Sequence, residues 1–97
     1  VKIGLMDAEN FKGFNLLALN RLEEAKTCFE KALNINPASS QACAGLGEVF
    51  YLQGKDEEAK TMYEWGVANN TENEFAKAGL KKVNIALGHT PNHNSLN

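Results

Sequence analysis

The sequence predicts an all-α fold made of tandem antiparallel helical hairpins, and two observations lead to this prediction. The segment Glu23–Thr27 (EEAKT) occurs again, identically, at Glu57–Thr61, which indicates an internal repeat. Within the second copy, apolar residues recur at spacings of three and four, as they do on one face of a helix. Each period therefore contains two helices, and the chain holds two full periods and one further helix.

The helices are expected, in order, near residues 7–19, 21–35, 40–53, 56–69 and 73–87. Asn20, Gly54 and Gly88 occupy one column of the repeat, just after a helix, where glycine or asparagine supplies the left-handed residue that closes the last turn. Pro37 ends the second helix because it cannot donate the next backbone hydrogen bond. The acidic run 56–58 favours a helix start, where negative charge is stabilised.

Small residues are expected to face large ones between the helices. Gly13 and Gly47 lie in helix interiors, where glycine costs about 1 kcal/mol relative to alanine. The second helix of each copy carries one aromatic residue, Phe29 or Tyr63, at the equivalent position. Close approach of the antiparallel helices would offset the cost of the glycines.

This pattern resembles the tetratricopeptide repeat, a helix–turn–helix unit with a period of about 34 residues. The matching residues are Gly13, Leu16, Ala25, Phe29, Ala32 and Pro37 in the first copy, and Leu46, Gly47, Phe50, Ala59, Tyr63 and Gly66 in the second. The resemblance implies a right-handed solenoid over residues 1–88, with repeats at about 6–39 and 40–73, a capping helix at about 74–87, and a flexible polar tail at 89–97.

Several positions depart from the family pattern. Thr71 replaces the proline that closes a repeat, so a looser junction is expected there. Lys81 and Asn84 replace the glycine and the aromatic residue of the fifth helix, which suits a helix that covers the end of an array. Residues 1–5, with Val1, Ile3 and Leu5, are alternatively the end of a preceding helix.

The helix near 7–19 is apolar on two sides, and such a helix usually buries both. The side expected to face the core carries Ala8, Gly13, Leu16 and Leu19, and the opposite side carries Phe11, Phe14 and Leu17. In the family, the first helix of each repeat lines a concave groove that binds a ligand. The resemblance places this chain's main ligand contacts at Asn10, Phe11, Phe14, Leu17, Glu48, Tyr51, Leu52 and Lys82.

These residues predict an aromatic groove for an extended or helical apolar peptide. Glu48 would repel a carboxylate, so we expect no binding of the acidic C-terminal tails that chaperone-binding members of the family hold. The alternatives are that these rings are covered within a longer chain or that they mediate self-association. Trp65, on a partly exposed side of the fourth helix, is a possible second contact.

Catalytic, cofactor-binding and metal-binding residues are not expected. Cys28 and Cys43 lack the spacing and the nearby histidine of a redox or nucleophilic site. His89 and His93 have no cysteine or carboxylate neighbours that would complete a metal site. The paired acids Glu23–Glu24 and Glu57–Glu58 are adjacent on a helix, where side chains point about 100° apart, and cannot share a proton.

Composition narrows the class of partner. Twelve acidic and ten basic residues give a net charge of −2, which excludes the strongly basic surface of a nucleic-acid binder. The longest apolar runs have four residues, whereas a membrane span needs about 20. No signal peptide is visible, which favours the cytoplasm, although a chain that begins with Val1 suggests a fragment whose targeting signals would be missing.

The sequence therefore predicts a non-catalytic module that binds a protein or peptide. Two alternatives belong to other classes: a non-catalytic region of a larger bacterial enzyme, such as a glycosyltransferase, or a self-assembling scaffold. Further repeats or a catalytic domain beside this segment would separate the first alternative from a free adaptor.

Overall fold

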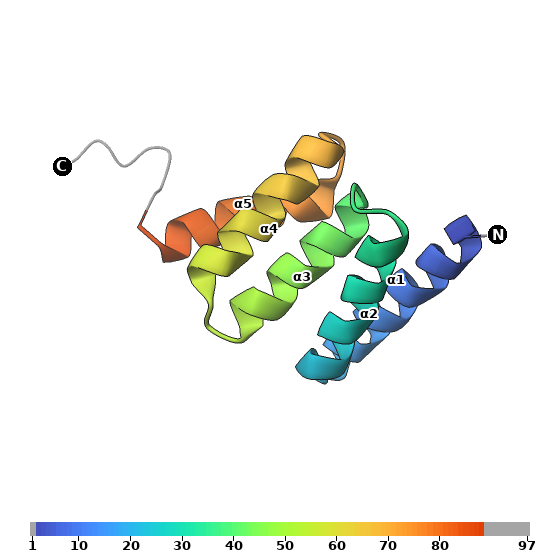
Figure 1. The fold of residues 1–97 in the computed structure, drawn as a ribbon. Helices are drawn as coiled ribbons and strands as arrows, with labels where there is room; N and C mark the ends of the chain where they lie inside the picture. Colours follow the sequence, from blue (N-terminus) through green and yellow to red (C-terminus); the bar gives the residue numbers. More distant parts are fainter. Residues whose placement is uncertain (1, 89–97) are drawn as a thin grey trace.

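The computed structural model describes residues 2–88, which form five α-helices without any strand in that range (Figure 1). Their bounds are α1 (Lys2–Ala18), α2 (Leu22–Ile35), α3 (Ser40–Leu52), α4 (Asp56–Asn69) and α5 (Glu74–Ala86). Successive helices run antiparallel and stack side by side as a helical solenoid, so the predicted fold class is confirmed. Within the described residues, no helix combines the length and the apolar character that crossing a bilayer requires.

The start of α1 differs from the prediction. Residues 2–6 belong to α1, so the alternative that residues 1–5 end a preceding helix is wrong for the described part of that segment. The physical reason is that no proline or turn residue separates this segment from residue 7. Gly4 lies inside the helix, where it weakens the helix by about 1 kcal/mol without breaking it.

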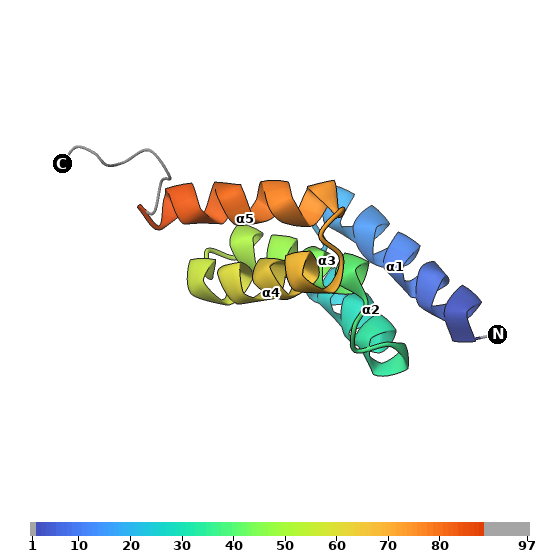
Figure 2. The ribbon, with the colours of Figure 1, turned by 90° about the horizontal axis from the view of Figure 1, so that it is seen from above.

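The five helices form two layers, with α3 at the centre. Helix α3 contacts each of the other four helices, whereas the backbones of α2 and α4 do not approach each other closely. Viewed from above, α5 and α1 lie over the layer that contains α2 and α4 (Figure 2). The odd-numbered helices α1, α3 and α5 thus form one continuous layer, and the even-numbered helices α2 and α4 form the second layer, which packs against it.

Two aromatic rings form the centres of the core, and each lies between two helical glycines. Phe29 and Tyr63 are fully buried. A Cβ atom at Gly13 would lie 2.7 Å from Phe29 Cε1, and one at Gly47 would lie 2.9 Å from Tyr63 Cδ1. The expected pairing of glycine with aromatic ring is therefore present in both repeats.

A second pair of glycines, each in the repeat that follows, contacts the same two rings. Gly45 of α3 lies against Phe29, and Gly79 of α5 lies against Tyr63, closely enough that neither ring leaves room for a Cβ atom. Because Gly45 and Gly79 also occupy equivalent positions, one repeat apart, each ring joins its own repeat to the one that follows.

Equivalent turns have the same geometry, both within the repeats and between them. Asn20, Gly54 and Gly88 have φ angles of 60°, 80° and 83°, which confirms the left-handed column. In the turn that contains Thr71, Asn70 Oδ1 accepts a hydrogen bond of 2.9 Å from the amide of residue 72. The turn after Pro37 has an equivalent bond from an asparagine side chain, so the junction at Thr71 shows the same hydrogen-bonded turn rather than a looser one.

Only two of the four residues expected to face the core from the first helix are buried. Gly13 and Leu16 are buried, but Ala8 is exposed and Leu19 is 64% exposed. The residues equivalent to Ala8 in the later repeats, Ala42 and Ala76, are both fully buried. They are buried because α3 and α5 each pack on a preceding even-numbered helix, whereas nothing among the described residues covers that side of α1.

Candidate partner-binding face

The predicted ligand residues of α1 are found in three different environments. Leu17 and Phe14 are half-buried. Asn10 is only 2% exposed, and neither atom of its amide has a hydrogen-bond partner among the described residues. Phe11 is 72% exposed and is equivalent to Gly45 and Gly79 of the later repeats. Asn10 is therefore out of reach of a ligand, and Phe11 lies on the side of α1 that faces away from α2 and α3.

Phe14 packs within the molecule instead of standing free. Its ring meets the ring of Phe29 edge-on at a centroid distance of 4.9 Å, and it meets the ring of Phe75 in the same manner at 5.5 Å. Phe14 lies in the last turns of α1, and Phe75 lies in the first turn of α5. The pair Phe14–Phe75 thus joins the first and the last odd-numbered helix.

The middle of this layer is occupied by a hydrogen-bonded network centred on Glu48. Glu48 Oε1 accepts one hydrogen bond from the Tyr63 hydroxyl at 2.5 Å and another from Lys82 Nζ at 2.8 Å. Lys82 Nζ also lies 4.5 Å from the centroid of the Tyr51 ring, which is within the range of a cation–π contact. The lysine charge is therefore already neutralised by a side chain that is 19% exposed.

Four apolar side chains remain accessible at the carboxyl ends of the odd-numbered helices. Leu17, Tyr51 and Ile85 follow one another at intervals of one repeat, so they occupy one column of the repeat, and Leu52 stands beside Tyr51. Leu17 and Tyr51 are half-buried, whereas Leu52 and Ile85 are about half exposed. We refer to Leu17, Tyr51 and Ile85 as the apolar row.

A family model described as the tetratricopeptide repeat (TPR) matches residues 16–83. The chain belongs to this family. Its fold is also similar to a solved structure described as that of YrrB, a TPR protein with an unusual peptide-binding site: the TM-score is 0.73 and the sequence identity 28%. That match covers 79% of this chain and 40% of the other.

One curated relative is a much longer protein. The chain is 38% identical over 61 residues to the cellulose synthase operon protein C of Komagataeibacter xylinus. This match covers 63% of the chain but only 5% of the relative. A role in protein interaction is the general property of the TPR fold.

Tyr63, the TPR aromatic residue of the second repeat, is held in its neutral form. Burial and the adjacent Glu48 carboxylate raise the pKa of Tyr63 well above its ordinary value. In the unfolded chain a tyrosine ionises near pH 10, so this contribution to stability is complete below about pH 10 and is lost as the pH rises from there towards the folded-state pKa.

A comparison with Tyr63→Phe tests this effect. Between pH 8 and 11 the free energy of unfolding of the parent should fall by up to about 1.4 kcal/mol per pH unit more than that of the variant. Urea unfolding at the two pH values measures the difference, and titration of the shared lysines cancels in it. Parallel losses in both proteins would contradict the assignment.

The two cysteines of the TPR region are packing residues. Cys28 and Cys43 are both buried and free. Burial raises the pKa of both thiols, and in Cys28 the nearby Glu9 carboxylate raises it further. A thiol with a raised pKa is a poor nucleophile at neutral pH.

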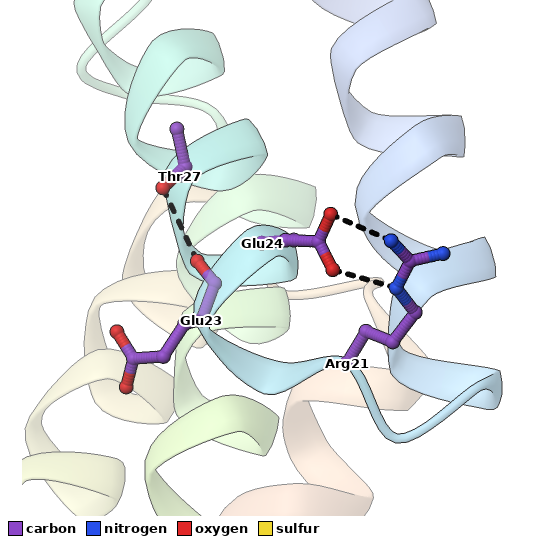
Figure 3. Close-up of polar contacts among 4 residues, drawn as sticks. All are labelled: Arg21, Glu23, Glu24 and Thr27. Carbon is purple, nitrogen blue, oxygen red and sulfur yellow. Dashed lines mark hydrogen bonds and ion pairs between the residues drawn. The ribbon is translucent and has the colours of Figure 1, made fainter.

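The paired acids at the start of α2 have separate partners (Figure 3). Glu24 receives two hydrogen bonds from the guanidinium of Arg21, at 2.6 and 2.8 Å. The Glu23 side chain points away from them, and its Oε2 accepts a bond of 2.8 Å from Gln53 Nε2. The two carboxylates do not share a proton, as predicted.

Among residues 2–88 no three metal-ligating side chains lie close enough together to hold an ion. The histidines considered as ligands, His89 and His93, and the predicted flexible tail lie outside the described residues. Trp65 of α4 is 56% exposed, in agreement with the partial exposure expected of it.

Proposed function

We propose that this TPR region is a non-catalytic interaction module that binds an extended peptide across the odd-numbered helices. The observation that carries the proposal is the apolar row, in which the same position of three successive repeats presents an accessible apolar side chain. An accessible apolar patch on an otherwise polar surface is typical of an interaction site. Leu52, Glu48 and Lys82 border the row and complete the proposed contact set.

The spacing of the row favours a particular peptide conformation. Neighbouring packed helices lie about 8–10 Å apart, so the row offers one apolar contact at roughly that interval. A polyproline II segment has three residues per turn and rises about 3.1 Å per residue, so every third side chain falls on the same side about 9 Å further on. A β-strand points residues three apart to opposite sides. We therefore expect ligands with apolar residues at i, i+3 and i+6.

Polar contacts are expected to be few and specific. Glu48 Oε1 already accepts two hydrogen bonds, but its other oxygen accepts none from the described residues. A peptide N–H beside the row could use this oxygen. Since Lys82 is paired with Glu48 at 2.8 Å, a free carboxylate of a ligand has no uncommitted cation there, consistent with the expectation that acidic tails do not bind.

Peptide-display selection against the chain tests the proposal. Peptides enriched by the parent should bind Leu17→Ala and Tyr51→Ala at least about tenfold more weakly, the effect of removing a contact worth more than about 1.4 kcal/mol. Trp65→Ala, which removes an exposed aromatic residue of α4, is the matched control and should bind as the parent does. Circular dichroism establishes that each variant is folded. Enrichment that survives both substitutions, or no enrichment, would contradict a binding site on this row.

The relative from Komagataeibacter xylinus favours a second candidate. A match that covers 5% of a longer protein suits a TPR segment that serves as the non-catalytic part of a larger protein. The apolar row would then hold a segment of that same protein. Sequencing of the parent gene, followed by display with peptides taken from its own product, distinguishes this candidate from an adaptor for a separate partner.

A further inference from the structure

The outer face of α1 is an apolar surface distinct from the apolar row. We use this name for the side of α1 that carries Leu5, Ala8, Phe11 and Leu19. Three of these residues are large and exposed: Leu5 by 56%, Phe11 by 72% and Leu19 by 64%. Leu5, Ala8 and Phe11 follow one another at helical spacing, and Leu19 comes directly after α1 ends at Ala18. The exposed Lys12 and Asn15 lie between Phe11 and Leu19.

The repeat shows what such a face normally contacts. Gly45 and Gly79, the equivalents of Phe11, each lie against an aromatic ring of the preceding even-numbered helix. In α1 a phenylalanine replaces this glycine. Its own ring therefore projects from the position at which α3 and α5 contact the ring of a neighbouring helix. An occupant of the outer face must therefore offer a cavity rather than another ring.

The opposite end of the same molecule has such a cavity. Helices α1 and α2 lie at one end of the array and α4 and α5 at the other (Figure 1). A cavity of about 260 Å³ opens on α4 and α5, with Val67 and Leu80 as its apolar lining and Lys77, Lys81 and Asn84 at its edges. A cavity of about 150 Å³ is enough to hold a benzene ring.

This cavity lies at a position of the repeat where the earlier repeats contact an aromatic ring. Lys81 is equivalent to Gly13 and Gly47, the residues against which Phe29 and Tyr63 lie. The cavity thus lies where the ring of a following helix would contact α5. A phenylalanine that entered it would contact α5 as Phe29 contacts α1.

Charges at the two ends are complementary. Asp7 is exposed one helical turn before Phe11, and Lys81 is exposed beside the cavity. Neither has an ion-pair partner among the described residues, whereas Lys77 is paired with Glu74 at 3.0 Å.

We propose that the occupant is a second copy of this chain, joined head to tail, with Phe11 of one copy in the α4–α5 cavity of the next. Asp7 then pairs with Lys81 across the contact. Because the two surfaces differ, the contact does not close on itself, and copies add in an open chain. This association uses neither Leu17 nor Tyr51, so it is independent of peptide binding on the apolar row.

Sedimentation velocity over a wide range of concentrations tests the proposal with two variants. Phe11→Ala removes the ring, and Asn84→Trp fills the cavity. The average mass of the parent should rise with concentration beyond that of a dimer, and each variant alone should stay monomeric. An equimolar mixture of the two variants should form a dimer and nothing larger, because one intact ring and one intact cavity remain.

A parent that is monomeric at every concentration would overturn the proposal. So would self-association of Asn84→Trp, since that variant keeps Phe11 and could pair only through two α1 faces. A charge exchange provides a second set that leaves the ring and the cavity intact. Asp7→Lys and Lys81→Glu should each associate more weakly than the parent. Their mixture should recover association beyond a dimer, because each variant has a partner of opposite charge at both of its ends. No recovery in that mixture would also contradict the assigned contact.

Discussion

Replacing Phe29 with alanine is expected to lower the free energy of unfolding by about 3–5 kcal/mol, the range for removing a buried aromatic ring. The ring is fully buried and lies between Gly13 and Gly45, so it holds α1, α2 and α3 together. Glycines have no side chains that could move into the space, and the cavity would stay largely open. Since a domain has only about 5–15 kcal/mol of stability, this one substitution would remove a large share of it.

The control for this prediction is Phe11→Ala. It is the same chemical change in the same repeat, but Phe11 is 72% exposed, so its stability should change by no more than about 0.5 kcal/mol. Urea unfolding followed by circular dichroism, at a concentration where the chain is monomeric, measures both values. Equal losses in the two variants would contradict the arrangement of the core.

Alanine at Gly45 or Gly79 is expected to destabilise the protein by about 1–3 kcal/mol, the usual cost of overpacking a core. In each case the new methyl group would overlap a buried ring, that of Phe29 or that of Tyr63. The loss should occur although alanine favours a helix over glycine by about 1 kcal/mol. Neither ring can move aside, because each is also held by a glycine of its own repeat.

Gly4→Ala is the matched control, because Gly4 is also inside a helix but a Cβ atom there meets nothing within 4 Å. This variant should gain up to about 1 kcal/mol from helix propensity alone. The two kinds of substitution thus differ in sign. A stability gain in Gly45→Ala or Gly79→Ala would show that the rings are not clamped between the repeats.

The fold can be predicted from the sequence because residues that make equivalent contacts in the two repeats recur at equivalent positions. The column of Asn20, Gly54 and Gly88 predicts the helix ends, and it coincides with the three positive φ angles. The pairing of Gly13 with Phe29 is predicted for the same reason. Four of the five helices agree with their predicted bounds to within one residue at each end.

The errors in predicted burial lie in α1, where the repeat gives no guidance. Its equivalents in α3 and α5 are covered by a preceding helix, whereas the described residues include no helix before α1. Ala8 and Leu19 are exposed for this reason, although their spacing suits a core face. The burial of Asn10 could not be anticipated, because the equivalent residues are alanines.

The arrangement of the candidate site depends on contacts between repeats that are far apart in the chain. The Phe14–Phe75 contact joins the first helix to the last and requires the curvature that brings the start of α5 towards Phe14 of α1. Such curvature arises from small rotations between successive repeats, and the spacing of apolar residues does not encode them. The network of Glu48, Tyr63 and Lys82 is likewise visible only once α3, α4 and α5 are placed together.

The claim that the odd-numbered helices hold a peptide is tested most directly by chemical-shift mapping. A peptide enriched by display is titrated into uniformly ¹⁵N-labelled protein, and the backbone amides are followed. The account predicts that the largest changes gather on α1, α3 and α5, around Leu17, Tyr51 and Ile85, and that α2 and α4 change little. Changes concentrated on α2 and α4, or on Trp65, would contradict it.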